Sequence, residues 1–385
     1  MSQIFQHSLR ERIVEKFLNK PEGCAFEFPE PDGKVSNQEA LSAAVSIGIY
    51  LESLGLAQGE IIAILHDQTR DAYLAQLALF LHGVPYVIVD QDSPDERISR
   101  IHIKVGFKVM LVFGGGGLSR VFPVPTASLR LTDLGPAQGP LNPIFPQVLT
   151  TDIAYLVLTS GSTGEPKAVA ITHLNLLCFV DWALESFMLG PKDVFASLNP
   201  PHFDNAVFDF FCSQASGGHL FIIRAATLQD PSALPKVLQE SGCTVWFSVP
   251  SLIIFLMKTK VLTSESISGF RKVIFGGEGF PMKHLERLWN LTRPAKTRLW
   301  NVYGPSECAC MCSAHEIRLE DINFSDDLAP IGRISEMFRF SLENTDTKGV
   351  GELLLLGPQV GPGYRGDYAA TSRAFPEFND TASGE

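Results

Sequence analysis

The sequence lacks any apolar run long enough to cross a membrane, although 45% of its 385 residues are hydrophobic. It also lacks an excess of basic residues, because 31 lysines and arginines stand against 42 aspartates and glutamates, giving a formal net charge of −11. A surface of that sign disfavours nucleic acid as a partner. The 45% hydrophobic and 19% charged content instead predicts a soluble globular enzyme, and the length predicts two or three packed subdomains.

Paired cysteines are missing too. The seven cysteines are an odd number. Residues 3–20 are charged throughout and have apolar residues at helical spacing, so they are predicted to form an amphipathic helix and not a signal peptide. We therefore expect reduced thiols and a cytoplasmic location. The alternation of Cys308, Cys310 and Cys312 predicts three thiols on one face of a strand. Without a C-x-x-C pair or a second ligand pair, they are expected to be small buried residues, not zinc ligands.

Two common nucleotide-binding motifs are absent. Residues 114–117 are four glycines, but G-x-G-x-x-G fails because Ser119 occupies the last position. A Walker A loop requires G-x-x-x-x-G-K-[ST] leading into a helix. The candidate loop at residues 159–167 has its glycines too close together, and its lysine follows a proline. Both Rossmann-type and P-loop nucleotide binding are therefore disfavoured.

What the chain does contain is Thr-Ser-Gly-Ser-Thr-Gly-Glu-Pro-Lys at residues 159–167, between apolar runs at residues 155–158 and 168–171. Glycine permits close backbone approach, so such a loop can direct N–H groups and hydroxyls onto a polyanion. Lys167 would add a positive charge to the same phosphates. A solvated turn is the alternative, but the complete motif between two strands favours triphosphate binding. Thr172 is expected to cap the helix that follows.

This stretch resembles the phosphate loop of the adenylate-forming superfamily, which contains acyl- and aryl-CoA ligases, luciferases and the amino-acid adenylation domains of peptide synthetases. Ala168 stands where the family usually has glycine. The resemblance implies an α/β fold of two doubly wound αβα subdomains, approximately residues 1–190 and 191–325, followed by part of a small distorted β-barrel at 326–385. The alternation of helix and strand patterns over residues 36–89 independently predicts a parallel α/β sheet.

The resemblance covers the family's large domain only. The ribose-binding aspartate and the small domain with its adenylation lysine have no match, and we do not assign the ribose role to Asp367. We therefore expect residues 1–385 to be a large-domain fragment without the C-terminal small domain.

A second motif, Asn-Val-Tyr-Gly-Pro-Ser-Glu at residues 301–307, resembles the family's Asn-x-Tyr-Gly-Pro-Thr-Glu. Tyr303 offers a face for adenine, Ser306 a hydroxyl for the α-phosphate, and Glu307 a hard oxygen for Mg²⁺. Glycines after an apolar strand at residues 276–279 would let adenine approach the backbone. Lys167 and Glu307 are the predicted catalytic residues, and Glu307 the metal ligand. The predicted nucleotide-binding residues are Thr159, Ser160, Gly161, Ser162, Thr163, Gly164, Lys167, Gly277, Glu278, Gly279, Asn301, Tyr303, Gly304 and Ser306.

Phe203 and Asp204 follow a strand end and two prolines. From the residues alone, Asp204 could cap a helix. The resemblance implies instead that Asp204 binds the α-ammonium group of an amino acid, an acid that acyl- and aryl-CoA ligases lack, and that Phe203 is an aromatic gate. Ala206 replaces the family's usual serine. By motif position, a mainly apolar acyl pocket would also include Asn205, Phe208, Phe247, Ile274, Gly276, Val302, Cys310 and Met311.

The predicted activity is conversion of an amino acid and ATP to aminoacyl-AMP and pyrophosphate, with Mg²⁺, followed by loading onto the phosphopantetheine thiol of a carrier protein. The pattern Phe-Asp-x-x-Val-x-Asp, ending at Asp209, is similar to D-alanine–carrier-protein ligases. An acyl- or aryl-CoA ligase, or a nucleotide-binding module without catalysis, remains an alternative from the sequence.

Overall fold

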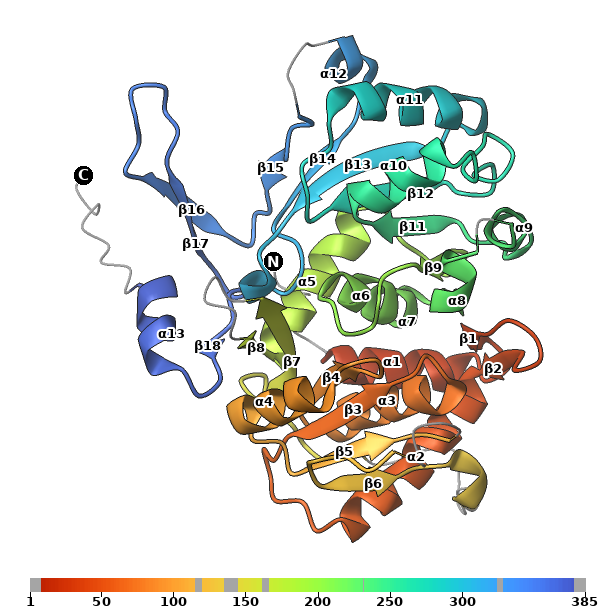
Figure 1. Cartoon of the computed structure of the whole chain (residues 1–385), viewed down its shortest axis with the longest axis vertical. Helices are drawn as coiled ribbons and strands as arrows, with labels where there is room; N and C mark the ends of the chain where they lie inside the picture. The colour runs from red at the N-terminus through yellow and green to blue at the C-terminus, as the bar shows by residue number, and fades with distance from the viewer. Residues whose placement is uncertain are drawn as a thin grey trace.

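The computed structural model describes residues 8–114, 120–134, 145–160, 166–230, 232–323 and 328–376, apart from the side chains of Ser160 and Asn323. Two sheets flanked by helices form two lobes (Figure 1). One sheet has seven strands in the order β18-β8-β7-β4-β3-β5-β6, and the other has nine in the order β15-β14-β13-β12-β11-β9-β10-β1-β2. The predicted α/β class is confirmed.

The seven-stranded sheet is built from alternating helices and strands of the first half of the chain. Its helix α2 is capped by Ser36: the Ser36 hydroxyl accepts from the Glu39 N–H at 3.1 Å, and the Glu39 carboxylate accepts from the Ser36 N–H at 2.7 Å. The elements of this half are α1 (Leu9–Asn19), α2 (Asn37–Ser53), β3 (Ile62–His66), α3 (Arg70–His82), β4 (Tyr86–Asp90), α4 (Asp95–Val105), β5 (Val109–Val112), β6 (Thr126–Ser128), the short 3₁₀ turn η2 (Leu131–Asp133), β7 (Ile153–Ser160), β8 (Pro166–Thr172) and α5 (His173–Ser186).

Strands β7 and β8 flank the predicted phosphate loop. They pair antiparallel, with Thr159 opposite Lys167, whereas β3, β4 and β5 are parallel as predicted. The sheet is therefore mixed, because the loop between β7 and β8 is too short for the crossover that parallel strands require. Thr172 caps α5 as predicted, since its hydroxyl accepts from the Asn175 N–H at 3.2 Å.

The nine-stranded sheet takes most of its elements from residues 191–334. They are β9 (Val194–Ser197), α6 (Asn205–Val207), the π-helical segment η3 (Phe208–Cys212), α7 (Ser213–Ser216), β10 (His219–Ile222), α8 (Ala225–Leu228), α9 (Leu234–Glu240), β11 (Val245–Ser248), α10 (Pro250–Lys258), β12 (Lys272–Gly276), α11 (Met282–Thr292), the 3₁₀ turns η4 (Arg293–Ala295) and η5 (Ser306–Cys308), β13 (Arg298–Tyr303), β14 (Ser313–Glu316), α12 (Leu319–Asn323) and β15 (Arg333–Ile334).

Two strands of this sheet come from the N-terminal region. β1 (Cys24–Glu27) runs parallel to β10 and β2 (Lys34–Ser36) closes the edge, so the predicted division near residue 190 does not separate the two sheets. Four- and three-residue strands carry too little periodicity to indicate their sheet, and their pairing joins residues far apart in the sequence.

The predicted barrel region consists of β16 (Arg339–Glu343), β17 (Glu352–Leu356), β18 (Gly363–Tyr364) and α13 (Tyr368–Ala374). β16 and β17 form a two-stranded sheet that projects from the body of the molecule (Figure 1), and β18 instead pairs with β8. No barrel closes within the described part of residues 326–376. Among the described residues, no helix combines the length and the apolarity that a membrane span requires.

The largest hydrophobic core lies where the lobes meet. It joins Phe80 of α3, Tyr155 of β7, Phe179 of α5, and Phe208 and Phe211 of η3, all nearly inaccessible to solvent. Burial of so many rings makes the junction between the lobes rigid, and the cavity described below opens at its edge.

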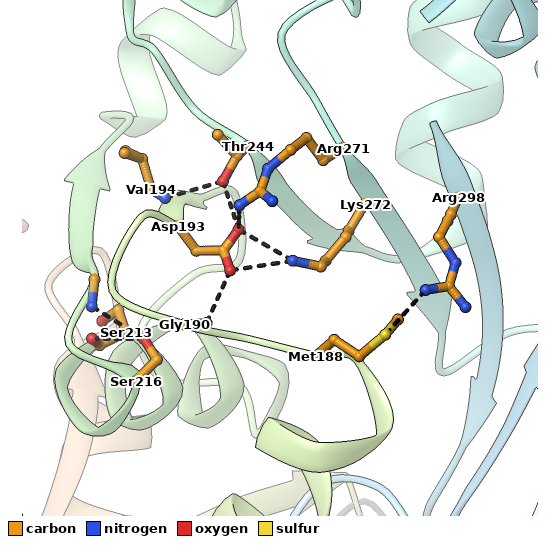
Figure 2. Close-up of polar contacts among 11 residues, drawn as sticks. Met188, Gly190, Asp193, Val194, Ser213, Ser216, Thr244, Arg271, Lys272 and Arg298 are labelled. Atoms are coloured by element: carbon orange, nitrogen blue, oxygen red, sulfur yellow. Dashed lines mark hydrogen bonds and ion pairs between the residues drawn. The ribbon is translucent and has the colours of Figure 1, made fainter. Parts of the chain in front are cut away.

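A buried ion pair lies where parallel strands of the nine-stranded sheet begin (Figure 2). Asp193, 2% exposed, precedes β9 and lies 3.1 Å from Lys272 Nζ at the start of β12. Its carboxylate also accepts from the Thr244 hydroxyl at 2.8 Å, the Gly190 N–H at 2.9 Å and the Arg271 guanidinium at 2.5 Å. These contacts tie together the starts of three parallel strands.

We expect Asp193→Ala to lower the free energy of unfolding by about 3 to 5 kcal/mol, because it leaves the Lys272 ammonium buried without its counter-charge. Urea denaturation at pH 7 measures the loss. Glu240→Ala, which breaks the exposed Lys236–Glu240 pair, is the control and should leave stability nearly unchanged. Equal effects of the two substitutions would contradict the structural role assigned to Asp193.

Candidate active site

A cavity of about 320 Å³ lies where the nine-stranded sheet faces β7. It opens at the carboxyl ends of β9, β11, β12 and β13, where open α/β sheets usually bind ligands. All its lining residues except Val157, Leu158 and Pro305 are among the predicted site residues. The lining comprises Val157, Leu158, Thr159, Phe203, Asp204, Asn205, Phe247, Gly277, Val302, Gly304, Pro305, Ser306, Cys310 and Met311.

Asp204 is the charged residue of this lining. It precedes α6, but its side chain makes no capping hydrogen bond, so the helix-cap interpretation fails. The carboxylate instead accepts a hydrogen bond from the Ser306 hydroxyl. Burial raises the pKa of Asp204, the Ser306 hydrogen bond opposes that rise, and nearby Glu307 adds to it. A partly buried carboxylate in a cavity, without a cation partner among the described residues, is suited to bind an ammonium group.

The apolar end of the cavity is formed by Phe247, Val302, Cys310 and Met311. Three other predicted pocket residues lie behind this wall. Phe208 packs edge-on against Phe247, with ring centroids 5.3 Å apart, and Ile274 is fully buried. Gly276 is packed so closely on β13 that a Cβ atom would lie 2.4 Å from the Val302 carbonyl oxygen. These three residues set the position of the wall without lining it.

Asn199, which the sequence analysis missed, connects two parts of this wall. Its Nδ2 donates to Asp209 Oδ2 in η3 and to the Phe247 carbonyl oxygen, both at 2.9 Å. Asp209 is 2% exposed, and its Oδ1 has no hydrogen-bond partner among the described residues. Burial raises the pKa of Asp209 well above its ordinary value. Burial thus favours the protonated, neutral carboxyl, and η3 is held to the end of β11 through one amide.

The phosphate-loop residues are only partly described. Thr159 lines the cavity and Ser160 ends β7, while Gly161, Ser162, Thr163 and Gly164 lie outside the described residues. Lys167 projects from β8, with Nζ 4.8 Å from the centroid of the Tyr364 ring. The Tyr364 hydroxyl donates to Glu307 Oε1 at 2.5 Å. The structure therefore brings Lys167 and Glu307 to the two sides of one tyrosine, beside the cavity.

Glu307 fits Mg²⁺ by the chemistry of its donors. Its second carboxylate oxygen has no hydrogen-bond donor among the described residues, and hydroxyls of Ser306 and Thr159 lie on the adjacent wall. Mg²⁺ prefers one or two carboxylates together with phosphate oxygens and water.

The other predicted nucleotide-binding residues differ in their exposure. Tyr303 ends β13 and is 39% exposed, so a ring face is accessible for adenine. Gly277 lines the cavity and has a φ of +85°, a value that favours glycine. The Glu278 carboxylate accepts hydrogen bonds from the Ser251 N–H and hydroxyl, each at 3.1 Å. Asn301 turns inward, donating to the Ala329 and Pro330 carbonyl oxygens.

Gly279 and Gly304 are each closely packed. A Cβ on Gly279 would lie 3.0 Å from the Leu328 side chain, and one on Gly304 would lie 2.4 Å from Met311 Cα. Gly304 therefore allows the turn after β13 to pack against the segment that supplies Cys310 and Met311. Asn301 holds the loop at residues 329–330 and does not line the cavity, so its role in the site is structural.

The strand predicted for Cys308, Cys310 and Cys312 is wrong. Cys308 ends the 3₁₀ turn η5, and φ values of +51° at Ala309 and +89° at Cys310 break any extended run. Cys310 consequently lines the cavity, while Cys308 and Cys312 pack with Phe338 in a separate cluster. All seven cysteines lie in the described residues, and all are free thiols, as predicted.

Comparison with known proteins shows which protein family this chain matches. A family model described as "AMP-binding enzyme" matches residues 14–365. The chain is 31% identical over 361 residues to L-proline--[L-prolyl-carrier protein] ligase of Pseudomonas fluorescens, covering 88% of this chain and 71% of that protein. It is 28% identical over 368 residues to D-alanine--D-alanyl carrier protein ligase of Bacillus velezensis, covering 92% of this chain and 71% of the relative.

Solved structures show the same fold. The nonribosomal peptide synthetase FmoA3 superposes with a TM-score of 0.84 at 23% identity, over 95% of this chain and 39% of that one. PA1221, a peptide-synthetase protein with adenylation and carrier domains, superposes with a TM-score of 0.82 at 23% identity, over 96% of this chain and 63% of that one. The chain also spans only 64% of the L-proline--[L-prolyl-carrier protein] ligase of Streptomyces coelicolor.

Proposed function

Because the chain belongs to the AMP-binding enzyme family, we propose that its cavity binds an amino acid and ATP and supports formation of an aminoacyl adenylate with release of pyrophosphate. The relatives' names support a carrier protein as the later acceptor, and the phosphopantetheine thiol of that protein would receive the aminoacyl group. The seven free thiols support a cytoplasmic location.

The observation that carries this proposal is Asp204. It is the charged side chain in the lining of the described cavity, and it is partly buried without a cation partner. A substrate ammonium group would supply that partner, while the apolar wall of Phe247, Val302 and Met311 would contact an uncharged side chain. An acyl- or aryl-CoA ligase, the second candidate, would have no use for this acid.

The mechanism follows from position and charge. Asp204 holds the amine, so the substrate carboxylate is directed toward Ser306, Thr159 and the phosphate loop, where it can attack the α-phosphorus in line. The Lys167 ammonium balances charge on the phosphates. Glu307 would hold Mg²⁺, which supplies further neutralisation of the leaving pyrophosphate when bound.

Ser306 is engaged with Asp204 and is also the predicted contact to the α-phosphate. We propose that its hydroxyl turns from the carboxylate to the phosphate when the ammonium group occupies Asp204. One rotation of a hydroxyl would then couple the two substrates.

Thermal shift with non-hydrolysable aminoacyl-adenylate mimics tests the proposal. Ligand binding to the native state raises stability by RT ln(1 + [L]/Kd), about 2.7 kcal/mol at a hundredfold excess over Kd. We expect shifts with mimics of small or medium uncharged amino acids, and none with lysyl or glutamyl mimics. Shifts confined to fatty-acyl or aryl mimics would instead favour a CoA ligase, and an absence of any shift would contradict adenylate binding by this chain.

A further inference from the structure

A second group of ligating side chains lies on the nine-stranded sheet, on strands β1 and β10. Cys24 and Glu27 belong to β1, and His219 begins β10 beside it. The thiol sulfur, a carboxylate oxygen and an imidazole nitrogen all lie within 4.8 Å of one another. These strands contribute no residue to the cavity at Asp204, so the group is separate from the proposed active site.

A backbone irregularity explains why the two β1 side chains meet. Residues three apart on a regular strand point to opposite faces. Here Cys24 pairs with Ser36 and Phe26 with Val35 on β2, which is a register shift of one residue. The extra residue of this bulge brings Cys24 and Glu27 to the same side, and bulges of this kind are enriched at functional sites.

The separation of the imidazole and the carboxylate suits a tetrahedral metal ion. His219 Nε2 lies 3.3 Å from Glu27 Oε2, and in a zinc tetrahedron with bonds of about 2.0 to 2.2 Å the ligand atoms are about 3.3 to 3.6 Å apart. The buried His219 Nε2 atom has Glu27 Oε2 as its ion-pair neighbour and makes no further hydrogen bond among the described residues. Cys24 Sγ makes a single weak contact, 3.2 Å to the Phe26 carbonyl oxygen, which a small rotation would break.

Two lysines lie near the group. Lys34 Nζ is 3.1 Å from Glu27 Oε2, but its side chain is 66% exposed and can turn to solvent at small cost. Lys16 Nζ donates to the Gly218 carbonyl oxygen at 2.7 Å and to that of Ser213 at 3.4 Å. Its charge is thus directed to backbone oxygens, and a thiolate with a carboxylate supplies the two negative charges that a divalent ion requires.

We propose that Cys24, Glu27 and His219 form a Zn²⁺ site with a fourth position open to water. Sulfur and imidazole donors select zinc over Mg²⁺ and Ca²⁺, which require oxygen ligands. The bound ion would join β1 to β10 and so fix the N-terminal strands to the edge of the nine-stranded sheet. This proposal is independent of the proposed adenylation activity.

Titration of the full chain with Co²⁺, after removal of metals by a chelator, tests the site directly. We expect one Co²⁺ per chain, tetrahedral d–d absorption, a thiolate-to-metal charge-transfer band, and displacement by Zn²⁺ but not by Mg²⁺. Cys24→Ser should lose the charge-transfer band, and His219→Gln should weaken binding at least tenfold. Glu22→Gln, which removes an exposed carboxylate near the site, is the matched control and should bind as the unmodified chain does.

The fold of each variant is checked by its melting temperature in chelator, where the nearly isosteric Cys24→Ser should match the unmodified chain. A charge-transfer band that persists in folded Cys24→Ser would overturn the proposal. So would the absence of stoichiometric Co²⁺ binding to the unmodified chain, or equal Co²⁺ affinity of the unmodified chain and folded His219→Gln. Each readout is independent of adenylate formation and of Glu307.

Discussion

Replacing Asp204 with alanine should remove the preference of the cavity for amino acids. In the unmodified chain we expect an aminoacyl-adenylate mimic to bind about 10³-fold more tightly than its des-amino counterpart, because the counterpart leaves a partly buried carboxylate unpaired. That ratio corresponds to about 4 kcal/mol, within the range for breaking a buried charge pair. In Asp204→Ala the ratio should fall to near one. Calorimetric titration of both mimics into both proteins measures it.

Binding of AMP alone distinguishes an effect on recognition of the amine from an effect on binding of the nucleotide. AMP alone should bind Asp204→Ala at least as tightly as it binds the unmodified chain, because Tyr303 and Gly277 are unchanged and the Ser306 hydroxyl no longer donates to a carboxylate. Asp181→Ala serves as a control for loss of a carboxylate, because Asp181 on α5 pairs with Arg12 on α1. This variant should bind the two mimics with the same affinity ratio as the unmodified chain. If Asp204→Ala discriminated between the mimics as well as the unmodified chain does, the assignment of Asp204 to the ammonium group would be wrong.

The sequence was most informative where local chemistry decides local structure. Ser36 and Thr172 cap helices because a hydroxyl followed three residues later by a carboxylate or amide closes a reciprocal hydrogen-bonded box. The convergence of residues near 159, 204, 277 and 304 was implied by the family resemblance, and for the glycines near 277 it also followed from the rule that ligands bind at the carboxyl ends of strands. Motif resemblance then indicated which of these strand ends would meet.

Prediction from the sequence failed where long-range packing or an unusual backbone conformation determines the local structure. The pairing of β1 with β10 depends on contacts across about 195 positions of sequence, which no local pattern records. Positive φ at Ala309 and Cys310 separated three cysteines that alternation placed together. Asn199 could have been found only weakly: a polar residue ending an apolar strand is a signal, but its two partners lie 10 and 48 residues away.

Asp209→Asn is expected to change how stability depends on pH. Burial raises the pKa of Asp209 well above its usual value, although the hydrogen bond from Asn199 opposes that rise, and no cation faces the carboxyl among the described residues. The titratable groups beside it, Tyr73, Cys212 and Cys310, also have raised pKa values and stay neutral between pH 4 and 7. The folded state therefore keeps a proton that the unfolded chain releases.

The sign follows from linkage. Above the unfolded-state pKa, near 4, the folded state binds more protons, so Asp209 lowers stability as pH rises until the folded-state pKa is reached. The contribution is about 1.4 kcal/mol for each pH unit in that window. The amide introduced by Asp209→Asn would keep an acceptor for Asn199 but cannot ionise, so the variant should gain stability relative to the unmodified chain as pH rises from 4 until the folded-state pKa of Asp209 is reached.

Urea denaturation at pH 4, 5, 6 and 7 measures the difference between the two proteins. Asp230→Asn is the control, because hydrogen bonds from Ser232 lower the pKa of that exposed carboxyl. The stability that Asp230 contributes is complete above the unfolded-state pKa near 4, so the difference between Asp230→Asn and the unmodified chain should stay nearly constant from pH 4 to pH 7. Parallel stability curves for Asp209→Asn and the unmodified chain would mean that Asp209 is ionised in the fold. A second anion would then lie in η3, behind Phe247 of the cavity wall. A neutral Asp209 instead leaves Asp204 as the anion that faces the ammonium group, which is what selective binding of an amino acid requires.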